Sequence, residues 1–296
     1  MELVSRREDV AFAMAKFQIG QRKACELMQI DRSSCRYQPR RERELEVKQE
    51  AAEIAEAHPR FGYRRVTALL KRKGRRVNHK RVHRWTKELG LQVRRKLRKR
   101  FRREKPIESE SRAPNQQWAM DFVSDAAANG QSLRVLTVVD VFTRECLAME
   151  VATSISSRRV ARVLERVLAS GRGAPESLRV DNGPEFISTY LKTWSEQKRI
   201  GIRHIQPGKP VQNAHIESFN GKLRDECLNM NWFLNLGDAR EKIEDWRRHY
   251  NHERPHSSLG YRTPVEFSRA TCPGKPLPPG LPCHAAQEVG NRLSCS

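Results

Sequence analysis

Apolar side chains in the first forty residues recur at the three- and four-residue spacing of amphipathic helices. The pattern predicts short helices over residues 11–17, 21–28 and 32–37, with Asp31 as the N-cap of the last one. Helices joined by tight turns are typical of a helix-turn-helix unit, which we delimit as residues 1–45. A three-helix support without DNA contact fits the same pattern, because no base-reading signature accompanies it.

A second helical unit, with a helix-turn-helix-like pattern, covers residues 46–93. An alanine-rich helix over 50–57 precedes a helix that ends at Gly74, and a further helix begins after Asn78, a residue suited to capping. The last helix has one apolar stripe and basic residues on its other faces. The stripe is Val82, Trp85 and Leu89, with Trp85 predicted to be core, and the expected DNA contacts are Asn78, Lys80, Arg81 and Arg84.

From residue 117 onward the pattern changes to alternating strands and helices. Three consecutive apolar strands separated by turn-prone residues predict an antiparallel meander, which is followed by helices that alternate with two further strands. The expected strands are 118–124, 133–141, 146–151, 178–180 and 202–205, and the expected helices are 157–169, 188–197, 213–228 and 238–250. The predicted fold class is therefore α/β, a mixed five-stranded sheet with flanking helices, preceded by an all-α helix-turn-helix region. This core is delimited as residues 114–269, and the Pro-rich residues 270–296 are predicted to be a disordered tail.

Charge is unevenly distributed along the 296 residues, whose formal net charge is +22. Residues 1–113 contain 33 Lys and Arg against 15 Asp and Glu, so the helical half is the basic one and indicates a polyanionic partner. Nine of the twelve residues 94–105 are basic, and we interpret 94–113 as a basic linker along the DNA backbone. A merely solvated tether has the same composition. The expected contacts in this linker are Arg94, Arg95, Lys96, Arg98, Lys99 and Arg100.

Several classes of protein are excluded or disfavoured by the sequence. There is no uncharged apolar run of about 18 residues and no apolar signal core, which predicts no membrane contact and a cytoplasmic, nucleoid-associated protein. The seven cysteines include no Cys-x-x-Cys, which favours reduced thiols over disulfides or zinc. His249, His252 and His256 suggest a zinc site, but no cysteine stands at ligand spacing. A tyrosine recombinase depends on a His-x-x-Arg box, and the chain contains none.

Three acidic residues carry the candidate chemistry. Asp181 and Glu217 have 35 residues between them, and Asp121 lies inside an apolar strand. Acids on buried strands and on an amphipathic helix can hold two hard divalent cations, which take oxygen ligands and retain open positions for phosphate. The pattern predicts phosphodiester chemistry on nucleic acid. Asp125 and Asp140 compete for the role of Asp121, and Glu185 is a candidate accessory residue.

The runs around these acids resemble a known family. The two aspartates, the 35-residue spacing and the glutamate resemble the triad of the retroviral-integrase superfamily. The neighbouring runs resemble the second-reading-frame product of insertion-sequence transposases of the IS3 family. The matching runs are 58–65, 77–82, 180–186, 212–221, 224–229 and 250–261, so the resemblance covers most of the chain up to about Phe267.

The resemblance implies an RNase H-like core that uses two Mg²⁺ or Mn²⁺ ions, held by the three acids, to cleave element ends and transfer strands. In the family, a basic residue seven positions after the glutamate contacts DNA, and Arg224 occupies that place on the helix face of Glu217. Asn182 and Asn213, which belong to these runs, and Lys222, which follows the run 212–221, are further expected DNA contacts.

The expected partners are double-stranded DNA, at element ends and targets, and further copies of the chain in a homo-oligomer on DNA. The family's full enzyme is usually a frameshift fusion whose upstream part supplies a helix-turn-helix and a leucine zipper, and this chain has no heptad run. An upstream-frame product or a fusion is therefore a further expected partner. The alternative function is a catalytically idle DNA-binding regulator or a remnant of a transposable element.

Overall fold

The computed structural model describes residues 3–36, 41–93, 111–206 and 213–271. Its N-terminal unit consists of three helices around a small apolar core that includes Val10, Ala24 and Ile30. The first helix begins well before the predicted residue 11, because its charged first half has too few apolar residues to show a period. These helices are α1 (Leu3–Phe17), α2 (Gln21–Leu27) and α3 (Arg32–Arg36).

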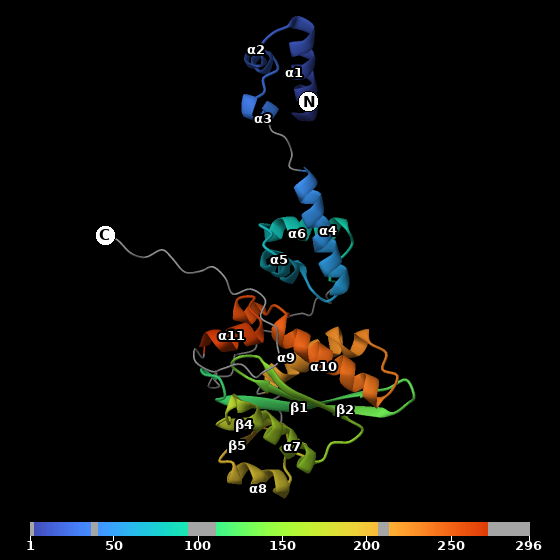
Figure 1. The fold of residues 1–296 in the computed structure, drawn as a ribbon, viewed down its shortest axis with the longest axis vertical. Coiled ribbons are helices and arrows are strands. Elements are labelled where there is room, and N and C mark those ends of the chain that lie inside the picture. The colour runs from blue at the N-terminus through green and yellow to red at the C-terminus, as the bar shows by residue number, and fades with distance from the viewer. Residues whose placement is uncertain (1–2, 37–40, 94–110, 207–212, 272–296) are drawn as a thin grey trace, which may run out of the picture.

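The second helical unit lies between the first unit and the sheet (Figure 1). Its helices are α4 (Arg41–Ala57), α5 (Tyr63–Arg72) and α6 (His79–Glu88). The side chain of Asn78 caps α6 by accepting a hydrogen bond from the backbone N–H of Lys80 at 2.9 Å. Trp85 is buried, as predicted. The prediction for Leu89 is wrong: α6 ends at Glu88, and the side chain of Leu89 is 43% exposed.

The described residues from 111 onward form the predicted mixed five-stranded sheet, with strand order β3-β2-β1-β4-β5. Strands β1 to β3 are antiparallel neighbours, whereas β4 is parallel to both β1 and β5. The sheet therefore changes from antiparallel to parallel at β1. The strands are β1 (Gln117–Ala126), β2 (Ser132–Asp140), β3 (Cys146–Ala152), β4 (Ser177–Val180) and β5 (Gly201–His204).

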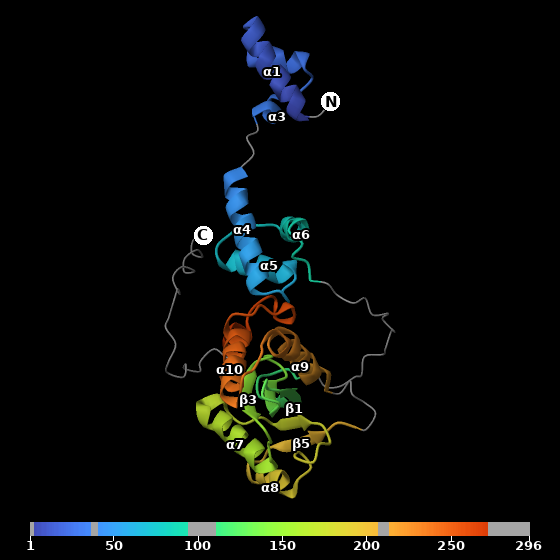
Figure 2. The same cartoon turned by 90° about the vertical axis from the view of Figure 1, so that its right-hand side faces the viewer.

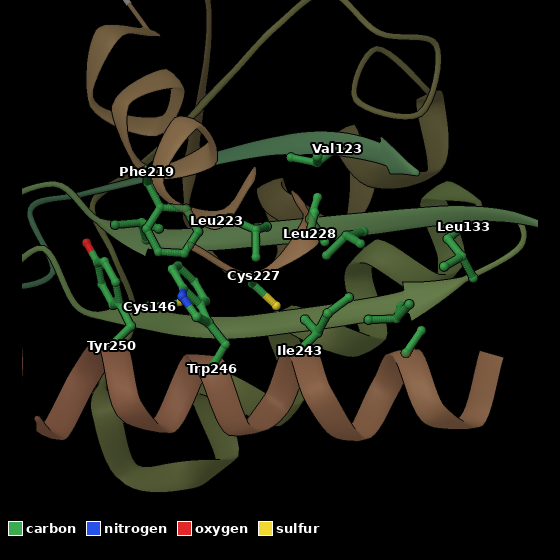
Figure 3. Packing of buried hydrophobic residues seen from close by; sticks show 14 of the residues in the cluster. Val123, Leu133, Cys146, Phe219, Leu223, Cys227, Leu228, Ile243, Trp246 and Tyr250 are labelled. Atoms are coloured by element: carbon green, nitrogen blue, oxygen red, sulfur yellow. The ribbon is translucent and has the colours of Figure 1, made fainter. Parts of the chain in front are cut away.

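Helices cover both faces of the sheet and produce two hydrophobic layers (Figures 1 and 2). Alternate residues of β1 supply the two layers: Trp118 and Met120 pack with α7 and α8, whereas Ala119 and Val123 pack with α9 and α10. In the second layer, Trp246 and Tyr250 of α10 pack against Phe219 of α9 (Figure 3). The helices are α7 (Ser157–Val167), α8 (Thr189–Gln197), α9 (Ala214–Glu226) and α10 (Leu236–His252).

The chain continues beyond α10 with structure that the sequence pattern did not predict. A 3₁₀ turn, η4 (Ser257–Leu259), leads to helix α11 (Pro264–Thr271), after the last helix expected from the sequence, at 238–250. The expected linker contacts of residues 94–100 lie outside the described residues, as does most of the expected tail. Within the described ranges, the model has no helix both long enough and apolar enough to cross a membrane.

Candidate active site

Asp121 lies in the middle of β1, on the sheet face that α9 covers. Its Oδ1 accepts a hydrogen bond from the backbone N–H of Phe122 at 2.8 Å, and its Oδ2 accepts one from Nδ2 of Asn220 at 2.8 Å. Two donors on one half-buried carboxylate fix its orientation. The strand therefore supplies Asp121, and the helix determines where its carboxylate points.

Asn220 is itself held in place from the sheet. Thr137 is the cross-strand partner of Asp121, and its buried hydroxyl lies 3.0 Å from Oδ1 of Asn220 and 3.1 Å from the carbonyl oxygen of Asp121. Since the Asn220 Oδ1 accepts from this hydroxyl, its Nδ2 faces the acid. Sequence analysis missed both residues. Asn220 could have been found from its position three residues after Glu217, on the same helix face, but nothing local in the sequence marks Thr137.

Asp181 follows directly after β4, in a turn that precedes α8. Its Oδ1 accepts a hydrogen bond from the backbone N–H of Gly183 at 3.0 Å. Phe186 is buried in the layer under α7 and α8, and its backbone N–H donates to the carbonyl oxygen of Gly183 at 2.9 Å. The turn is thus fixed at both ends, and Asp181 projects from a rigid backbone.

Glu185, which is part of this turn, forms an ion pair with an arginine of β2. Nη1 of Arg134 donates to Oε1 of Glu185 at 2.5 Å, and the guanidinium lies 4.0 Å from the centre of the Phe122 ring. The other carboxylate oxygen, Oε2, is buried and has no hydrogen-bond partner within the described part of the chain. Glu185 therefore pairs with Arg134 through Oε1 and leaves Oε2 without a donor in the described residues, a detail that the sequence did not specify.

Glu217 is exposed in the first turn of α9. Ile216, Phe219 and Leu223 fix the helix on the sheet, which leaves Glu217 at its edge. Seven residues later, Nη2 of the exposed Arg224 donates to the carbonyl oxygen of Ser124 at 3.1 Å. The helix thus carries an acidic residue near its start and a basic residue two turns further along.

The pKa of Asp121 reflects its surroundings, including the other two acids. The pKa of Asp121 is raised to about 6, first by burial and then by the negative charges of Asp181 and Glu217, while the Phe122 N–H and Asn220 oppose the rise. Asp181 and Glu217 are thus close enough to Asp121 for their charges to act on it. In the described ranges, no group of three or more His, Cys, Asp or Glu side chains is already arranged to hold a metal ion.

The two aspartates that competed with Asp121 have other surroundings. Asp140 is completely buried, and it accepts hydrogen bonds from the backbone N–H groups of Phe142, Thr143 and Asn115 and from Arg172. That carboxylate holds the β2–β3 turn together. Asp125 lies near the end of β1, and its charge adds to burial, the main cause, in raising the pKa of Cys227, the residue that follows α9.

The expected DNA contacts differ in exposure. Lys80, Arg81 and Arg84 are exposed on α6, although both arginines lie within 4.0 Å of Glu44. The Asn182 amide donates to the carbonyl oxygen of Ile205 at 3.0 Å and so ties the turn to the chain after β5. Asn213 is buried.

Lys222, another expected DNA contact, is half-buried in α9. Its ammonium donates to the carbonyl oxygen and the hydroxyl of Ser218, both at 2.9 Å. Burial, followed by the positive charge of Arg254, lowers its pKa to about 8, although Glu226 opposes that change. Lys222 and Asn213 would therefore need a local rearrangement to reach a DNA backbone.

The three histidines considered as zinc ligands pack against different partners. The His249 ring stacks on the His58 ring, with centroids 4.9 Å apart, and the His256 ring packs edge-on against Tyr250 at 4.7 Å. Burial is the main cause that lowers the pKa of each of His249, His252 and His256. His249 thus contacts the second helical unit, whereas His256 packs within the core.

Comparisons with known proteins agree with this fold. Residues 111–210 and 198–264 match family models described as integrase core domain, and residues 41–100 match an HTH-like domain. The chain is 46% identical over 258 residues to the insertion element IS407 uncharacterized 31.7 kDa protein of Burkholderia multivorans, covering 86% of this chain and 92% of that relative. The chain belongs to the IS3 family of insertion-sequence transposases.

More distant relatives of this transposase family support the same assignment. The putative transposase InsK for insertion sequence element IS150 of Escherichia coli is 29% identical over 243 residues, which cover 76% of this chain and 84% of InsK. Among solved structures, a chain of the simian T-cell lymphotropic virus intasome matches with a TM-score of 0.51 and 18% identity, over 69% of this chain and 73% of the other. That similarity concerns the fold alone.

The turn after β4 gives a first prediction. A Cβ at position 183 would lie 3.0 Å from Oδ1 of Asp181 and 3.4 Å from Oε2 of Glu185, so Gly183→Ala should lower the unfolding free energy by about 1 kcal/mol through crowding. The matched control is Gly221→Ala in α9, where a Cβ meets nothing within 4 Å; it should raise stability by about 0.5–1 kcal/mol through helix propensity. Urea denaturation measures both, and equal effects would contradict the crowding.

Proposed function

We propose that this chain is a DNA transposase that cleaves insertion-sequence ends and transfers the resulting strands, with Asp121, Asp181 and Glu217 as its catalytic and metal-binding residues. The observation that supports this most directly is the raised pKa of Asp121, because two neighbouring carboxylates cause part of it. Membership of the transposase family supplies the class of reaction. Burial is the larger cause of the raised pKa, and the two neighbouring negative charges add to it; a bound cation would relieve their repulsion.

The residues fit two divalent cations, Mg²⁺ or Mn²⁺, in the chemistry of their donors. All three proposed ligands are carboxylates, the donors that hard cations prefer, and Oε2 of Glu185 is a further buried oxygen without a donor. When bound, such ions supply activation of a water or a 3′-hydroxyl and stabilisation of the leaving oxygen. The three acids would hold them, and Glu185 with its Arg134 partner would adjust the charge around Asp181.

The remaining residues of the site orient the reactants. Asn220 and the Phe122 N–H hold the Asp121 carboxylate in one orientation, so the acid does not have to reorganise when substrate arrives. Arg224 lies on the face of α9 that carries Glu217, and we propose that its guanidinium contacts a DNA phosphate near the cleaved bond. Basic residues of α6, Lys80, Arg81 and Arg84, would contact the DNA backbone further from the cut.

Metal binding can be tested without any catalytic assay. Mn²⁺ should raise the Tm of the purified full chain, by about 5 °C at a concentration a hundredfold above its dissociation constant, because it binds the folded state alone. Asp121→Asn should remove this shift. Asp125→Asn is the matched control. It removes a carboxylate from the same strand, but one that faces the C-terminal end of α9 instead of Glu217, and it should retain the shift.

The same preparations distinguish a transposase from an idle DNA-binding regulator. With DNA that carries the element ends, Mn²⁺-dependent nicks should appear for the unaltered chain and for Asp125→Asn, but not for Asp121→Asn. Binding without nicking by the unaltered chain, together with no Mn²⁺ shift of Tm, would instead support the regulator.

A further inference from the structure

The second helical unit does not stand apart from the integrase core. In two views related by 90°, helix α5 lies directly against the region of α9, α10 and α11 (Figures 1 and 2). The contact joins residues 58–72 of the helical unit to residues 225–266 of the core, which include the sequence run 250–261. Neither the proposed catalysis nor a zinc site accounts for that run.

Stacked rings form the centre of this contact. The imidazole of His58 lies between the ring of Phe61, at 4.5 Å, and the ring of His249 of α10, at 4.9 Å. Phe61 is 3% exposed although it sits at the edge of its own unit. Burial lowers the pKa of both His58 and His249, so each imidazole is kept neutral there. Neutral stacked rings are the packing expected of a closed interface.

A buried arginine links the rings to the helix that carries Glu217. Arg254 is 1% exposed, and it donates two hydrogen bonds of 2.6 Å to the carboxylate of Glu226, the last residue of α9. Arg65 of α5 approaches the same carboxylate to 3.5 Å. The Arg254 guanidinium also lies 5.7 Å from the centre of the Phe61 ring. Glu226 is therefore shared between the core and the helical unit.

Arg72, the last residue of α5, closes the far side of the contact. Its guanidinium donates to Oε2 of Glu266 in α11 at 2.5 Å and to the carbonyl oxygens of Tyr261 and Glu253 at 3.2 and 3.3 Å. Because the guanidinium is planar and all three acceptors belong to the core, these hydrogen bonds fix the orientation of α5 on the core as well as its distance. At the near side, Arg60 lies 4.0 Å from Asp225.

From these contacts we propose that the run 250–261 is a docking site for the chain's own HTH-like unit, and that docking holds this unit in one orientation on the C-terminal end of α9. Both sides of the interface come from a single chain, and the charges are complementary, with arginines on the helical unit and glutamates on the core. Under the proposed function, on which this step rests, docking sets a fixed register between the DNA bound by α6 and the acids at the other end of α9.

Docking also divides the basic residues of the helical unit into two groups. Arg65 and Arg72 are engaged with acids of the core, whereas Lys71, Lys73 and Arg76 are exposed. The exposed group would meet the DNA backbone. The engaged group would not contribute to the salt dependence of DNA affinity, although its sequence position within a basic run suggests otherwise.

A charge exchange tests the docking in the full chain without DNA. Arg72→Glu should open the contact, so that backbone amides of residues 58–65 and 249–262 exchange hydrogen about tenfold faster and the radius of gyration rises. The double variant Arg72→Glu with Glu266→Arg should restore both measurements, since it recreates the ion pair with its charges exchanged. Lys71→Glu is the matched control; it makes the same charge change one residue earlier and should leave both unchanged.

Three outcomes would overturn the proposal. They are an unchanged exchange pattern in Arg72→Glu, a double variant that exchanges as fast as the single one, and an effect of the same size in Lys71→Glu. The molar mass, measured by light scattering, should be the same for all four proteins; a halved mass in Arg72→Glu would show that the unit docks on a second copy instead. Mn²⁺ binding to these variants tests the proposed function separately, because the acids are unaltered.

Discussion

Replacement of Glu217 by glutamine is expected to abolish cleavage of element-end DNA, with a rate lower by about a thousandfold or more, while DNA affinity changes less than twofold. Glutamine retains the size of the side chain and one acceptor oxygen, but it removes the charge that would hold a cation. Glu217 is exposed and its charge is one of two that raise the pKa of Asp121, so its removal should leave the unfolding free energy unchanged or slightly higher.

Single-turnover cleavage, filter binding and urea denaturation together make this expectation decisive. Glu196→Gln is a suitable control, because that glutamate lies on α8, on the opposite face of the sheet, and should affect none of the three measurements. If Glu217→Gln cut DNA at the normal rate, Glu217 would have no catalytic role. If it lost DNA binding and stability together, the loss of cleavage would reflect unfolding instead.

The largest expected effect on stability belongs to Arg254. Arg254→Ala removes the two hydrogen bonds to Glu226, whose side chain is 10% exposed, and it leaves a cavity against Phe61 and Tyr250. An acid left in such a place typically costs about 3–5 kcal/mol. We expect the variant to unfold at much lower urea concentration, with Arg65 recovering only part of the loss because it stands 3.5 Å from Glu226.

Arg248→Ala provides the comparison for Arg254→Ala. Arg248 lies in α10, its side chain is 69% exposed, and among the described residues its ion pair is with Glu244 at the surface. That change should cost less than about 0.5 kcal/mol. Arg254→Lys should fall between the two, because a lysine keeps the charge but cannot form both hydrogen bonds. Equal midpoints for the Arg254→Ala and Arg248→Ala variants would show that the buried pair does not stabilise the core.

The strands and most helices follow from the sequence because their burial is local and periodic. The sheet could be predicted since β1 to β3 alternate or run apolar between clear turns. Helix α11 was missed although a local signal marks its start: the Thr263 N–H donates to Oε2 of Glu266 at 2.7 Å, and the Glu266 N–H donates to the Thr263 hydroxyl at 3.2 Å. The exposed Leu89 shows the opposite error, since a spacing of four residues predicts a shared face only while the helix continues.

The choice of the three acids depended on a different kind of signal. The spacing of Asp181 and Glu217 and the apolar run around Asp121 are visible in the sequence, and resemblance to a family supported the choice. The rejection of Asp140 required the structure, because three backbone N–H groups from the following turn and from Asn115 converge on its carboxylate. The hydrogen bonds of Asn220 and Thr137 likewise depend on which strand pairs with β1, and sequence spacing does not determine that pairing.

Helix α9 has Glu217 near one end and Glu226 at the other, nine residues apart. At about 1.5 Å per residue the two acids are separated by roughly 13 Å along the axis. Because base pairs in DNA are stacked about 3.4 Å apart, this length corresponds to about four base pairs. With the HTH-like unit docked at Glu226, helix α9 would hold that unit at a fixed distance from Glu217 in the same protomer. A single inserted base pair between the recognised and cleaved positions would then displace the cut rather than abolish binding.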